Sequence, residues 1–576
     1  MQGAPPDATP FAALLACGCA PLHLKTLLQA HLQQRLSQRR VIVLEGLYGD
    51  LPGTLERASS QPLDAVALVL EWSDLDARLG YRSAGRWSLA ATNDILKCVA
   101  TAFERIGDAI GRLDRSVPIA LSLPALPLPP MFHTNLTQAS EAELELDSQL
   151  AMFASRMARL GGLAVVSAKR LAEESAPAGR FDLKSDLSIG FPYTVAHADA
   201  LTAACARLLV PPSPRKGVIT DLDDTLWNGL VGEIGAQGVS WELGRHNHLH
   251  ALYQNLLSSL AEQGILVAVA SKNDPEVVKR AISRTDLLLP AERVFPFEVH
   301  WQAKSGSVAR ILEAWNIAAG DVIFVDDSPM ELAEVEAAHP GIECVQFPRG
   351  DYPAGLEMLR RIRDLCGRAR LTGEDTLRLD SIRQGLQFRR MAEEGAVSES
   401  FLEQAGAVVT FDFAPSPEDT RVLDLVNKTN QFNLNGIRRT DADWQAGNRM
   451  QEALIAVVSY EDKFGPLGKI AVIQGRRSGT TLQVKTWVMS CRAFSRRVEY
   501  QCLRVLFERY GLTEIGFDFL ATSRNGPLQE FFASLLGAKP TGSVTLSRIE
   551  FESRCPALFQ RRIVAGDGQG EKTWTT

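Results

Sequence analysis

The sequence lacks the long apolar run that a membrane-spanning helix needs. No stretch of the 576 residues reaches the roughly 18 consecutive apolar residues required to cross a bilayer. The N-terminus also lacks the basic segment, apolar core and cleavage site that make up a secretory signal. We therefore expect a cytoplasmic protein.

Paired cysteines and an excess of basic residues are missing as well. The nine Cys are scattered singly, apart from Cys17 and Cys19, and no CxxC pair occurs, so neither a disulfide framework nor a zinc knuckle is indicated. The formal net charge of -7 argues against non-specific nucleic-acid binding, which needs Lys and Arg to neutralise phosphates. We expect free thiols, one of which is a candidate for catalysis.

The chain is too long for one hydrophobic core, because single cores stop growing near about 250 to 300 residues. Its composition, 45% hydrophobic and 22% charged, is that of an ordinary globular protein. The Pro-rich basic segment at 210–216 cannot continue a helix or pair in a central strand, so it marks a boundary. We predict an α/β domain, a second α/β domain, a helical linker and a mixed α+β domain, over residues 1–212, 213–372, 373–395 and 396–576.

Short apolar runs that alternate with helix-like stretches predict parallel sheets in the first two domains. The strands predicted in the N-terminal domain are 40–45, 64–71, 118–122 and 163–167. Those predicted in the central domain are 217–220, 265–270 and 322–325. Longer runs with partial alternation predict strands of a mixed sheet at 453–460, 468–474 and 482–489.

Polar residues follow each predicted strand of the central domain. The first strand runs into the acidic segment 221–225 (DLDDT), the second ends in 271–273 (SKN), and the third ends in 326–328 (DDS), with Lys304 between the last two in the chain. Open α/β sheets place ligands at these carboxyl ends. A DxDxT pattern alone fits a polar turn equally well, but the ordered set of Asp-x-Asp, Ser, Lys and Asp-Asp is specific.

These residue types fit phosphoryl transfer with Mg²⁺. Asp221 can attack phosphorus as a carboxylate nucleophile and form an aspartyl-phosphate. Asp223 can protonate the leaving oxygen and later activate water. Mg²⁺ prefers hard oxygen ligands, so we expect Asp221, the main-chain carbonyl of Asp223 and Asp326 to hold it, with Asp327 in support.

Four further residues are predicted to bind the phosphoryl group. Ser271 would donate a hydrogen bond to the phosphoryl oxygens, together with its neighbours Lys272 and Asn273. Lys304 would neutralise the charge that the acids and a phosphate concentrate.

Residues 217 to about 368 resemble the haloacid dehalogenase (HAD) superfamily through these motifs. Three segments resemble its FkbH-like branch more closely: 221–233 (DLDDTLWNGLVGE), 271–274 (SKND) and 301–305 (WQAKS). Asn228 and Ile234 depart mildly from that branch, where Gly and an acid are usual. The intervals between the motifs are too short for a cap domain. We therefore expect an open site suited to a large substrate, such as a group tethered to a carrier protein, unless another domain forms a lid.

Cys491 is the thiol candidate. It is predicted to end a strand and face a helix N-terminus, near Arg492 and Arg496, and these influences lower a thiol pKa and favour the thiolate. The alternative is a buried structural Cys, which is a common fate of free thiols.

Residues from about 400 to 560 resemble the acetyltransferase-like (GNAT) domain of FkbH-like proteins. The resemblance rests on 428–434 (KTNQFNL), 462–465 (DKFG), the segment around Cys491, and 522–525 (TSRN). Lys463 stands where an Arg is usual. Asn430, Gln431 and Asn433, with Arg492 and Arg496, are candidates for binding the acyl group or pantetheine amides. For the three amide side chains, a polar helix-capping loop is an equally good interpretation.

This resemblance implies a bifunctional enzyme. It would take a glyceryl-type acyl group from 1,3-bisphosphoglycerate, release phosphate, and pass the group through an enzyme thioester to the phosphopantetheine thiol of an acyl carrier protein, for polyketide-type biosynthesis. Many relatives carry a Cys where Ala270 stands, so Cys491 remains the main thiol candidate. A simple phosphatase and a scaffold that binds a carrier protein are the alternatives.

The N-terminal domain resembles the SGNH-hydrolase-like domain of longer FkbH-like proteins, although no Gly-Asp-Ser nucleophile is present. A Gly-rich loop at 46–50 could bind a ligand, but we expect a scaffold or docking role rather than catalysis. His246, His248 and His250 are close in sequence. Without an accompanying Cys or acid cluster we interpret them as helix surface rather than as a metal site.

Overall fold

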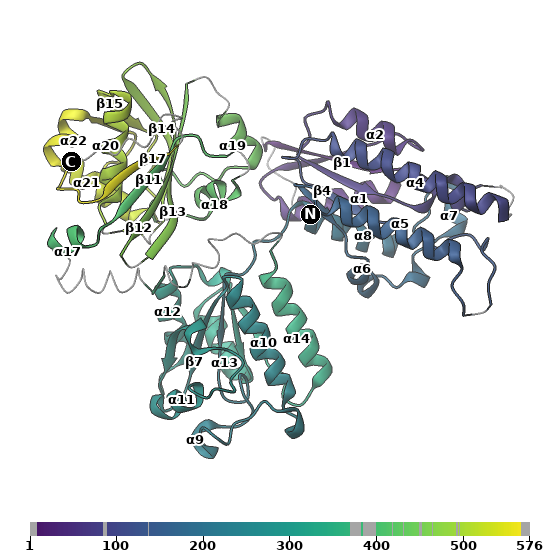
Figure 1. Cartoon of the computed structure of the whole chain (residues 1–576), viewed down its shortest axis with the longest axis horizontal. Helices are drawn as coiled ribbons and strands as arrows, with labels where there is room; N and C mark the ends of the chain where they lie inside the picture. Colours follow the sequence, from purple (N-terminus) through teal and green to yellow (C-terminus); the bar gives the residue numbers. More distant parts are fainter. Residues whose placement is uncertain are drawn as a thin grey trace. The chain divides into compact units, whose positions relative to one another are not determined.

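The computed structural model divides the chain into two compact units, Met1–Pro212 and Ser213–Thr576 (Figure 1). It describes residues 8–83, 89–135, 137–368, 379, 382–383, 399–416, 419–429, 431–448, 452–463, 465–490, 493–494, 496–522 and 524–565. The unit boundary falls in the Pro-rich segment, where proline removes backbone donors. The boundaries predicted within the second unit stay a prediction, and the linker predicted at 373–395 lies almost wholly outside the described residues.

The N-terminal unit is built on a parallel sheet with the strand order β2-β1-β3-β4-β5. Its strands are β1 (Pro10–Cys17), β2 (Arg40–Glu45), β3 (Ala65–Val69), β4 (Ile119–Ser122) and β5 (Leu163–Val165). Its helices are α1 (Leu22–Arg35), α2 (Leu51–Ala58), α3 (Trp72–Leu75), η1 (Ala77–Leu79), α4 (Leu89–Gly111), α5 (Glu141–Met157), α6 (Ala168–Glu174), η2 (Pro177–Gly179), α7 (Leu183–Ile189) and α8 (Val195–Leu209). The four predicted strands are confirmed, whereas β1 was not predicted. β3 is buried at every position, as expected for a strand that is covered on both faces.

The central part of the chain forms a second parallel sheet, with the order β10-β9-β6-β7-β8. Its strands are β6 (Gly217–Thr220), β7 (Leu266–Ser271), β8 (Val294–Val299), β9 (Val322–Asp326) and β10 (Glu343–Gln346). Its helices are α9 (Val231–Ile234), η3 (Leu243–Arg245), α10 (His248–Glu262), α11 (Pro275–Ile282), η4 (Ala291–Arg293), α12 (Lys304–Trp315), η5 (Ala319–Asp321), α13 (Pro329–Ala338) and α14 (Tyr352–Cys366). The sequence had predicted three of these strands and missed the two at the edges of the sheet, β8 and β10.

Helices cover both faces of the central sheet. Successive side chains of a strand point to opposite faces, so Val218 belongs to one buried cluster and Ile219 to another. The Val218 cluster includes residues of α10 and α14, which contact each other and lie side by side in Figure 1. The Ile219 cluster includes residues of α12 and α13. The result is a three-layer α/β domain, as predicted.

No cap domain interrupts the central domain, every residue of which between 217 and 304 is described. The interval from Thr225 to Ser271 forms α9, η3 and α10 before it enters β7. The interval from Ser271 to Lys304 forms only α11, η4 and β8. The predicted absence of a cap is therefore confirmed.

The C-terminal part forms a mixed seven-stranded sheet with the order β16-β15-β14-β13-β12-β11-β17. Its strands are β11 (Val408–Asp412), β12 (Ala453–Asp462), β13 (Gly465–Ser478), β14 (Thr481–Met489), β15 (Glu514–Phe517), β16 (Val544–Ser547) and β17 (Arg561–Ala565). Its helices are α17 (Glu399–Gln404), α18 (Thr420–Lys428), α19 (Asp441–Asn448), α20 (Val498–Tyr510), α21 (Gly526–Leu536) and α22 (Arg548–Arg554). The pairs β14–β15 and β11–β17 are parallel and the other neighbours antiparallel, so the predicted mixed α+β domain is confirmed.

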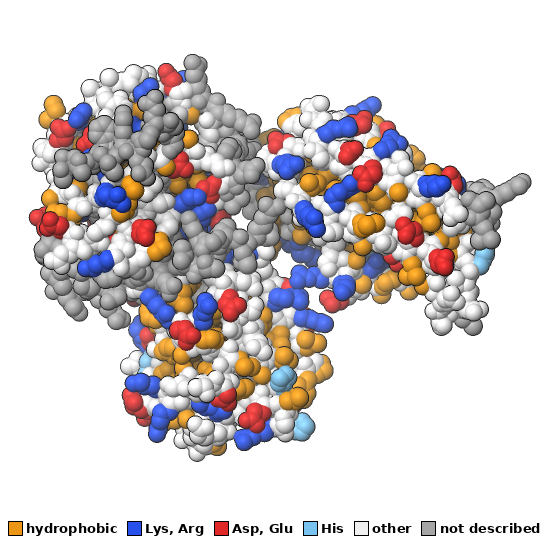
Figure 2. All heavy atoms as spheres, in the orientation of Figure 1, with side chains coloured by type: hydrophobic (Ala, Val, Ile, Leu, Met, Phe, Trp, Pro, Cys, Tyr) orange, Lys and Arg blue, Asp and Glu red, His pale blue; other side chains and the backbone are white. Residues whose placement is uncertain are grey.

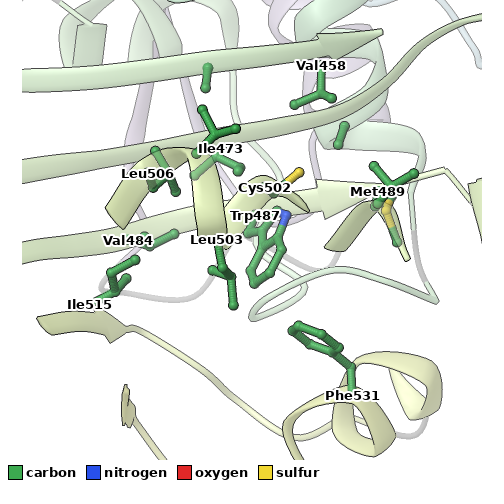
Figure 3. Packing of buried hydrophobic residues seen from close by; sticks show 14 of the residues in the cluster. Val458, Ile473, Val484, Trp487, Met489, Cys502, Leu503, Leu506, Ile515 and Phe531 are labelled. Atoms are coloured by element: carbon green, nitrogen blue, oxygen red, sulfur yellow. The ribbon is translucent and has the colours of Figure 1, made fainter. Parts of the chain in front are cut away.

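Trp487 on β14 lies at the centre of the C-terminal core. Its ring stacks on Phe517 at 5.6 Å between centroids and meets the edge of Phe531 at 5.7 Å. Figure 3 shows it beside Cys502 and Leu503 of α20. A smaller cluster on the opposite face joins α18 to β12, β13 and β14. Helices thus cover both faces of this sheet.

The described helices include none that is long and apolar enough to cross a membrane.

On the face that Figure 2 shows, Lys and Arg side chains lie among Asp and Glu side chains.

Candidate active site

Two aspartates leave neighbouring strands of the central sheet side by side. β6 and β9 are parallel and Thr220 pairs with Val325, so Asp221 and Asp326 occupy the next positions at the carboxyl edge. The main-chain N–H of Asp221 continues the pairing and donates to the carbonyl of Val325 at 2.9 Å. Asp221 is 5% exposed and Asp326 is fully buried. The register of two strands thus fixes the distance between these carboxylates.

Asp327 joins this pair to form a group of three carboxylates. One oxygen from each of Asp221, Asp326 and Asp327 lies within 4.8 Å of the other two. Closely spaced carboxylates repel each other unless a cation lies between them, and Mg²⁺ prefers such hard oxygen ligands. The carboxylate of Asp223 is not in the group, and the predicted role of its main-chain carbonyl stays a prediction. The three acids therefore fit a divalent cation.

Lys304 is the cation that contacts two of these acids. It is the first residue of α12 and 4% exposed, and its Nζ lies 3.0 Å from Asp221 Oδ1 and 2.6 Å from Asp326 Oδ2. Burial works to lower the pKa of Lys304, but the two carboxylates outweigh it and raise that pKa. Burial and the nearby Asp221 raise the pKa of Asp326 to about 6, against the opposing effect of Lys304. Lys304 is thus charged and directed at the nucleophile candidate.

Asp223 is held by three donors, two from the segment that follows it and one from the segment after β7. Its Oδ1 accepts from the indole N–H of Trp227 at 2.8 Å and from the main-chain N–H of Val231 at 3.1 Å. Its Oδ2 accepts from Asn273 Nδ2 at 3.1 Å. Burial raises its pKa, and these hydrogen bonds oppose the rise only in part. A carboxyl with a raised pKa, fixed in orientation, suits the transfer of a proton in either direction.

Three of the predicted phosphate-binding residues lie at the end of β7 and directly after it, in different surroundings. Ser271 is buried, and its Oγ accepts from Asn273 Nδ2 at 3.1 Å. Asn273 therefore links Ser271 to Asp223. Lys272 instead donates to Glu331 Oε1 on α13 at 2.7 Å. Ser271 and Asn273 are thus linked to Asp223, whereas Lys272 pairs with Glu331 of α13.

Two residues that contact this site were not predicted. His250, interpreted from the sequence as helix surface, is 8% exposed, so that interpretation was wrong for it. Its Nδ1 lies 2.9 Å from the carbonyl of Thr225, and its ring stacks on Phe347. Burial lowers its pKa. His250 lies on the face of α10 that packs against the sheet. Its contacts with Thr225 and Phe347 therefore became apparent only from the packing.

Arg349 is the second unpredicted residue, in the loop after β10. Its Nη2 pairs with Asp327 and lies 3.1 Å from Asp224 Oδ2. Burial raises the pKa of Asp327, and the charge of Arg349 opposes that rise. The sequence offered no signal for it, because the edge strand β10 was not predicted.

The site residues predicted in the C-terminal domain are only partly described. Cys491, Arg492 and Asn430 lie outside the described residues. Gln431 is half-buried. Asn433 is buried, and its Oδ1 accepts from the N–H groups of Asn435 and Gly436, an arrangement that fits the polar-loop interpretation.

Arg496 was a further candidate for acyl or pantetheine binding. It is 2% exposed, its Nε lies 3.5 Å from Asp462 Oδ2, and its guanidinium lies over the ring of Tyr460. Its described contacts therefore belong to a buried network within the domain.

The Gly-rich loop of the N-terminal unit lines a separate cavity of about 440 Å³. Tyr48 and Gly49 form one part of its wall, and Glu71 and Asp74 form another. Burial raises the pKa of Glu71 to about 8 and that of Asp74 to about 7. Glu71 Oε2 accepts from two main-chain N–H groups and its Oε1 accepts from Tyr193, so this acid is tied into the fold.

No protein-family model matches the sequence, and no curated protein matches it. Among solved structures, the chain is similar to the N-terminal part of the protein BF1531 from Bacteroides fragilis, which contains a phosphatase domain complexed with Mg. The identity is 17%, the match covers 63% of this chain and 96% of that chain, and the TM-score is 0.48.

Two further structures overlap with smaller parts of the chain. One is a cobalt-bound deoxy-D-mannose-octulosonate 8-phosphate phosphatase from Haemophilus influenzae, with 21% identity, coverage of 27% and 91%, and a TM-score of 0.21. The other is an uncharacterised protein from Corynebacterium glutamicum, with 15% identity, coverage of 28% and 98%, and a TM-score of 0.19.

Proposed function

We propose that the chain is a Mg²⁺-dependent phosphatase of the haloacid dehalogenase type, and that its phosphoryl chemistry serves acyl transfer. The observation that carries the first part is the group of buried Asp221, Asp326 and Asp327 with Lys304 in contact with Asp221. Lys304 contacts both Asp221 and Asp326, so the buried acids are paired with a buried positive charge. A nucleophilic carboxylate beside a phosphate does need that positive charge.

The reaction would proceed in two displacements at phosphorus. An oxygen of Asp221 attacks, the bond from phosphorus to the leaving oxygen breaks, and Asp223 gives that oxygen a proton. Asp223 then takes a proton from water as the water oxygen attacks the aspartyl-phosphate, which regenerates Asp221 and releases inorganic phosphate. Each step uses the charge state that the previous one leaves on Asp223.

The remaining residues act on charge and orientation. Lys304 offsets the negative charge that gathers when a phosphate meets Asp221 and Asp326. Asn273 connects Ser271 with Asp223, so the group that binds phosphoryl oxygens and the proton donor keep a fixed spacing. Mg²⁺ held by Asp221, Asp326 and Asp327 would stabilise negative charge on the phosphoryl oxygens.

The acyl-transfer half of the proposal rests on the FkbH-like motifs in the sequence and on the open site. The substrate would be 1,3-bisphosphoglycerate and the acceptor the phosphopantetheine thiol of an acyl carrier protein. The thiol of Cys491 would attack the acyl carbon and expel the C1 phosphate, which leaves a 3-phosphoglyceryl thioester. The Asp221 site would hydrolyse the C3 phosphate, and the carrier thiolate would displace Cys491 from the thioester. An open, capless site supports this assignment because a carrier-bound group needs access that a cap domain would restrict.

Intact mass spectrometry of the protein and the carrier tests both halves together. The full chain is incubated with Mg²⁺, a 1,3-bisphosphoglycerate-generating system and a phosphopantetheinylated carrier protein. We expect a glyceryl adduct on the carrier and free phosphate. Phosphate without an adduct would leave a plain phosphatase, and carrier binding without turnover would leave a scaffold.

Two variants with matched controls assign the chemistry. Asp221→Asn should abolish phosphate release. Asp364→Asn should not, since Asp364 is an exposed residue of α14.

Cys491→Ala should remove any enzyme-bound acyl group. Cys98→Ala, which changes an exposed cysteine, should retain that group. An acyl adduct that survives Cys491→Ala would refute the thiol assignment.

A further inference from the structure

The guanidinium of Arg349 lies at the rim of the site. We use rim for Asp224, Asp327 and the loop after β10. Its side chain is 60% exposed, whereas those of its partners Asp224 and Asp327 are 17% and 8% exposed. The ion pairs therefore anchor one end of an otherwise accessible group. The neighbouring strands β6, β9 and β10 bring the three residues together.

Both ion pairs of Arg349 use the same nitrogen. Nη2 contacts Asp327 and Asp224, and among the described residues Nε and Nη1 have no polar partner. A guanidinium carries five N–H donors in a planar fork that matches the two oxygens of a carboxylate or phosphate. Part of this fork is thus free to bind an anion from solvent.

The negative charge around Arg349 indicates which kind of ligand would gain from a contact with its guanidinium. Asp223, Asp224 and Asp327 give the rim a negative character, and each of them is partly buried, where charges are screened less than in water. A substrate with a second anionic group, besides the phosphoryl group that reacts, would be repelled by these acids. Arg349 is placed to reverse that repulsion at one point. Residues 217–304, all of which are described, contain no inserted cap domain that could supply another residue for substrate selection.

We propose that Arg349 is a specificity-determining residue that binds a second anionic group, a carboxylate or a second phosphate, of a phosphorylated substrate. This inference rests on the proposed phosphatase activity of the same site. The two ion pairs hold the guanidinium in place, and the free face of its fork binds the remote anion. Phosphate monoesters of the same size that lack a second anionic group gain nothing from it.

Two substrates that differ in one group test the proposal. 3-Phosphoglycerate and glycerol 3-phosphate have the same carbon chain, but one ends in a carboxylate and the other in a hydroxymethyl group. Phosphate release is measured with the full Mg²⁺-loaded chain, its Arg349→Gln and Arg349→Lys variants, and the control Arg360→Gln. Arg360 is an exposed arginine of α14, and its Nη1 lies 3.8 Å from Glu357 Oε2.

We expect Arg349→Gln to lower kcat/KM for 3-phosphoglycerate by about 10- to 100-fold, the range set by one hydrogen bond between charged groups. Most of the loss should appear in KM. Glycerol 3-phosphate should lose less than about threefold, Arg349→Lys should fall between, and Arg360→Gln should match the parent protein. Equal losses on both substrates would show that Arg349 acts only through Asp327, and no loss would show that it does not touch substrate. Either result overturns the proposal.

A binding measurement separates this inference from the proposed activity. In the Asp221→Asn background, calorimetry compares the affinity for 3-phosphoglycerate with and without Arg349→Gln. If the parent protein releases phosphate from neither compound, the proposed activity toward small esters fails. The calorimetric difference still decides the role of Arg349: a loss of about 10-fold or more supports it, and equal affinities refute it.

Discussion

At the scale of single residues, the carboxyls of the site differ in what holds them. Asp326 faces Lys304, whereas Asp223 faces an indole, a main-chain N–H and an amide. A charged partner favours the ionised form, and neutral donors favour it less. The two acids are therefore suited to different tasks, one to holding positive charge and the other to exchanging a proton.

Trp227→Phe tests the orientation of Asp223. The fully buried indole donates to Asp223 Oδ1, and Phe keeps the apolar surface but removes that donor. We expect kcat to fall by about 10-fold, since a hydrogen bond to a charged group contributes about 1.5 to 3 kcal/mol, with KM little changed. Steady-state phosphate release measures this. Trp241→Phe is the control, because Trp241 Nε1 donates to the carbonyl of Asp286 instead; equal losses in both variants would indicate general destabilisation.

Glu71 provides a prediction on pH. Burial raises its pKa in the folded protein to about 8 from a usual value of 4.5. The folded state then binds the proton of Glu71 more tightly than the unfolded chain does. The contribution of Glu71 to the free energy of unfolding is therefore largest below pH 4.5 and falls as the pH rises towards and through 8. In Glu71→Gln this loss should vanish, which makes the variant more stable than the parent at pH 9 by about 2 to 4 kcal/mol but not at pH 5. Hydrogen exchange of peptides from residues 65–75 measures the difference, and parallel pH profiles would contradict it.

At the scale of elements, β6 and α12 set the position of Lys304. Trp315, near the end of α12, packs over Gly217 at the start of β6, and its Nε1 donates to the carbonyl of Phe295 at 2.7 Å. A Cβ on Gly217 would lie 2.5 Å from the Trp315 ring. Only glycine lets the helix approach the strand this closely, and Lys304 is the first residue of that helix.

Gly217→Ala should therefore displace α12 and destabilise the second unit by about 1 to 3 kcal/mol, as overpacking of a core does. Phosphate release should fall with it, because Lys304 moves away from Asp221. Gly306→Ala, on the same helix, is the opposite control: its Cβ would meet only the end of Arg310, at 3.6 Å, and alanine favours helix by up to about 1 kcal/mol. Urea unfolding compares the two, and a Gly217→Ala variant as stable as the parent would refute the packing argument.

At the scale of the whole molecule, the two units carry separate sites. The cluster of three acids lies in the unit Ser213–Thr576, and the cavity with Glu71 and Asp74 lies in Met1–Pro212. A ligand stabilises the unit that binds it in the folded state. The response of each unit to a ligand thus reports on its own site.

Mg²⁺ should stabilise the second unit and leave the first unchanged. At a concentration of 100 times its Kd, the gain is about 2.7 kcal/mol, and a chelator should reverse it. Hydrogen exchange of peptides covering residues 217–231 and 322–331 would slow, while peptides of the N-terminal unit would not respond. Asp326→Asn should remove the effect; protection that persists in this variant would place the metal elsewhere.

The strongly apolar strands and the acidic or polar residues that follow them could be predicted from the amino-acid sequence, because a buried parallel strand is a continuous apolar run and ends in a polar turn. The absence of a cap could be predicted as well, because it follows from the short chain length between the motifs. The tertiary structure was needed to show which side chains meet across strands: that Lys304 lies between Asp221 and Asp326, that Asn273 reaches Asp223, and that Arg349, in the loop after the unpredicted edge strand β10, reaches the acids. Those contacts depend on strand order and helix packing, which join residues far apart in the chain and leave no local pattern.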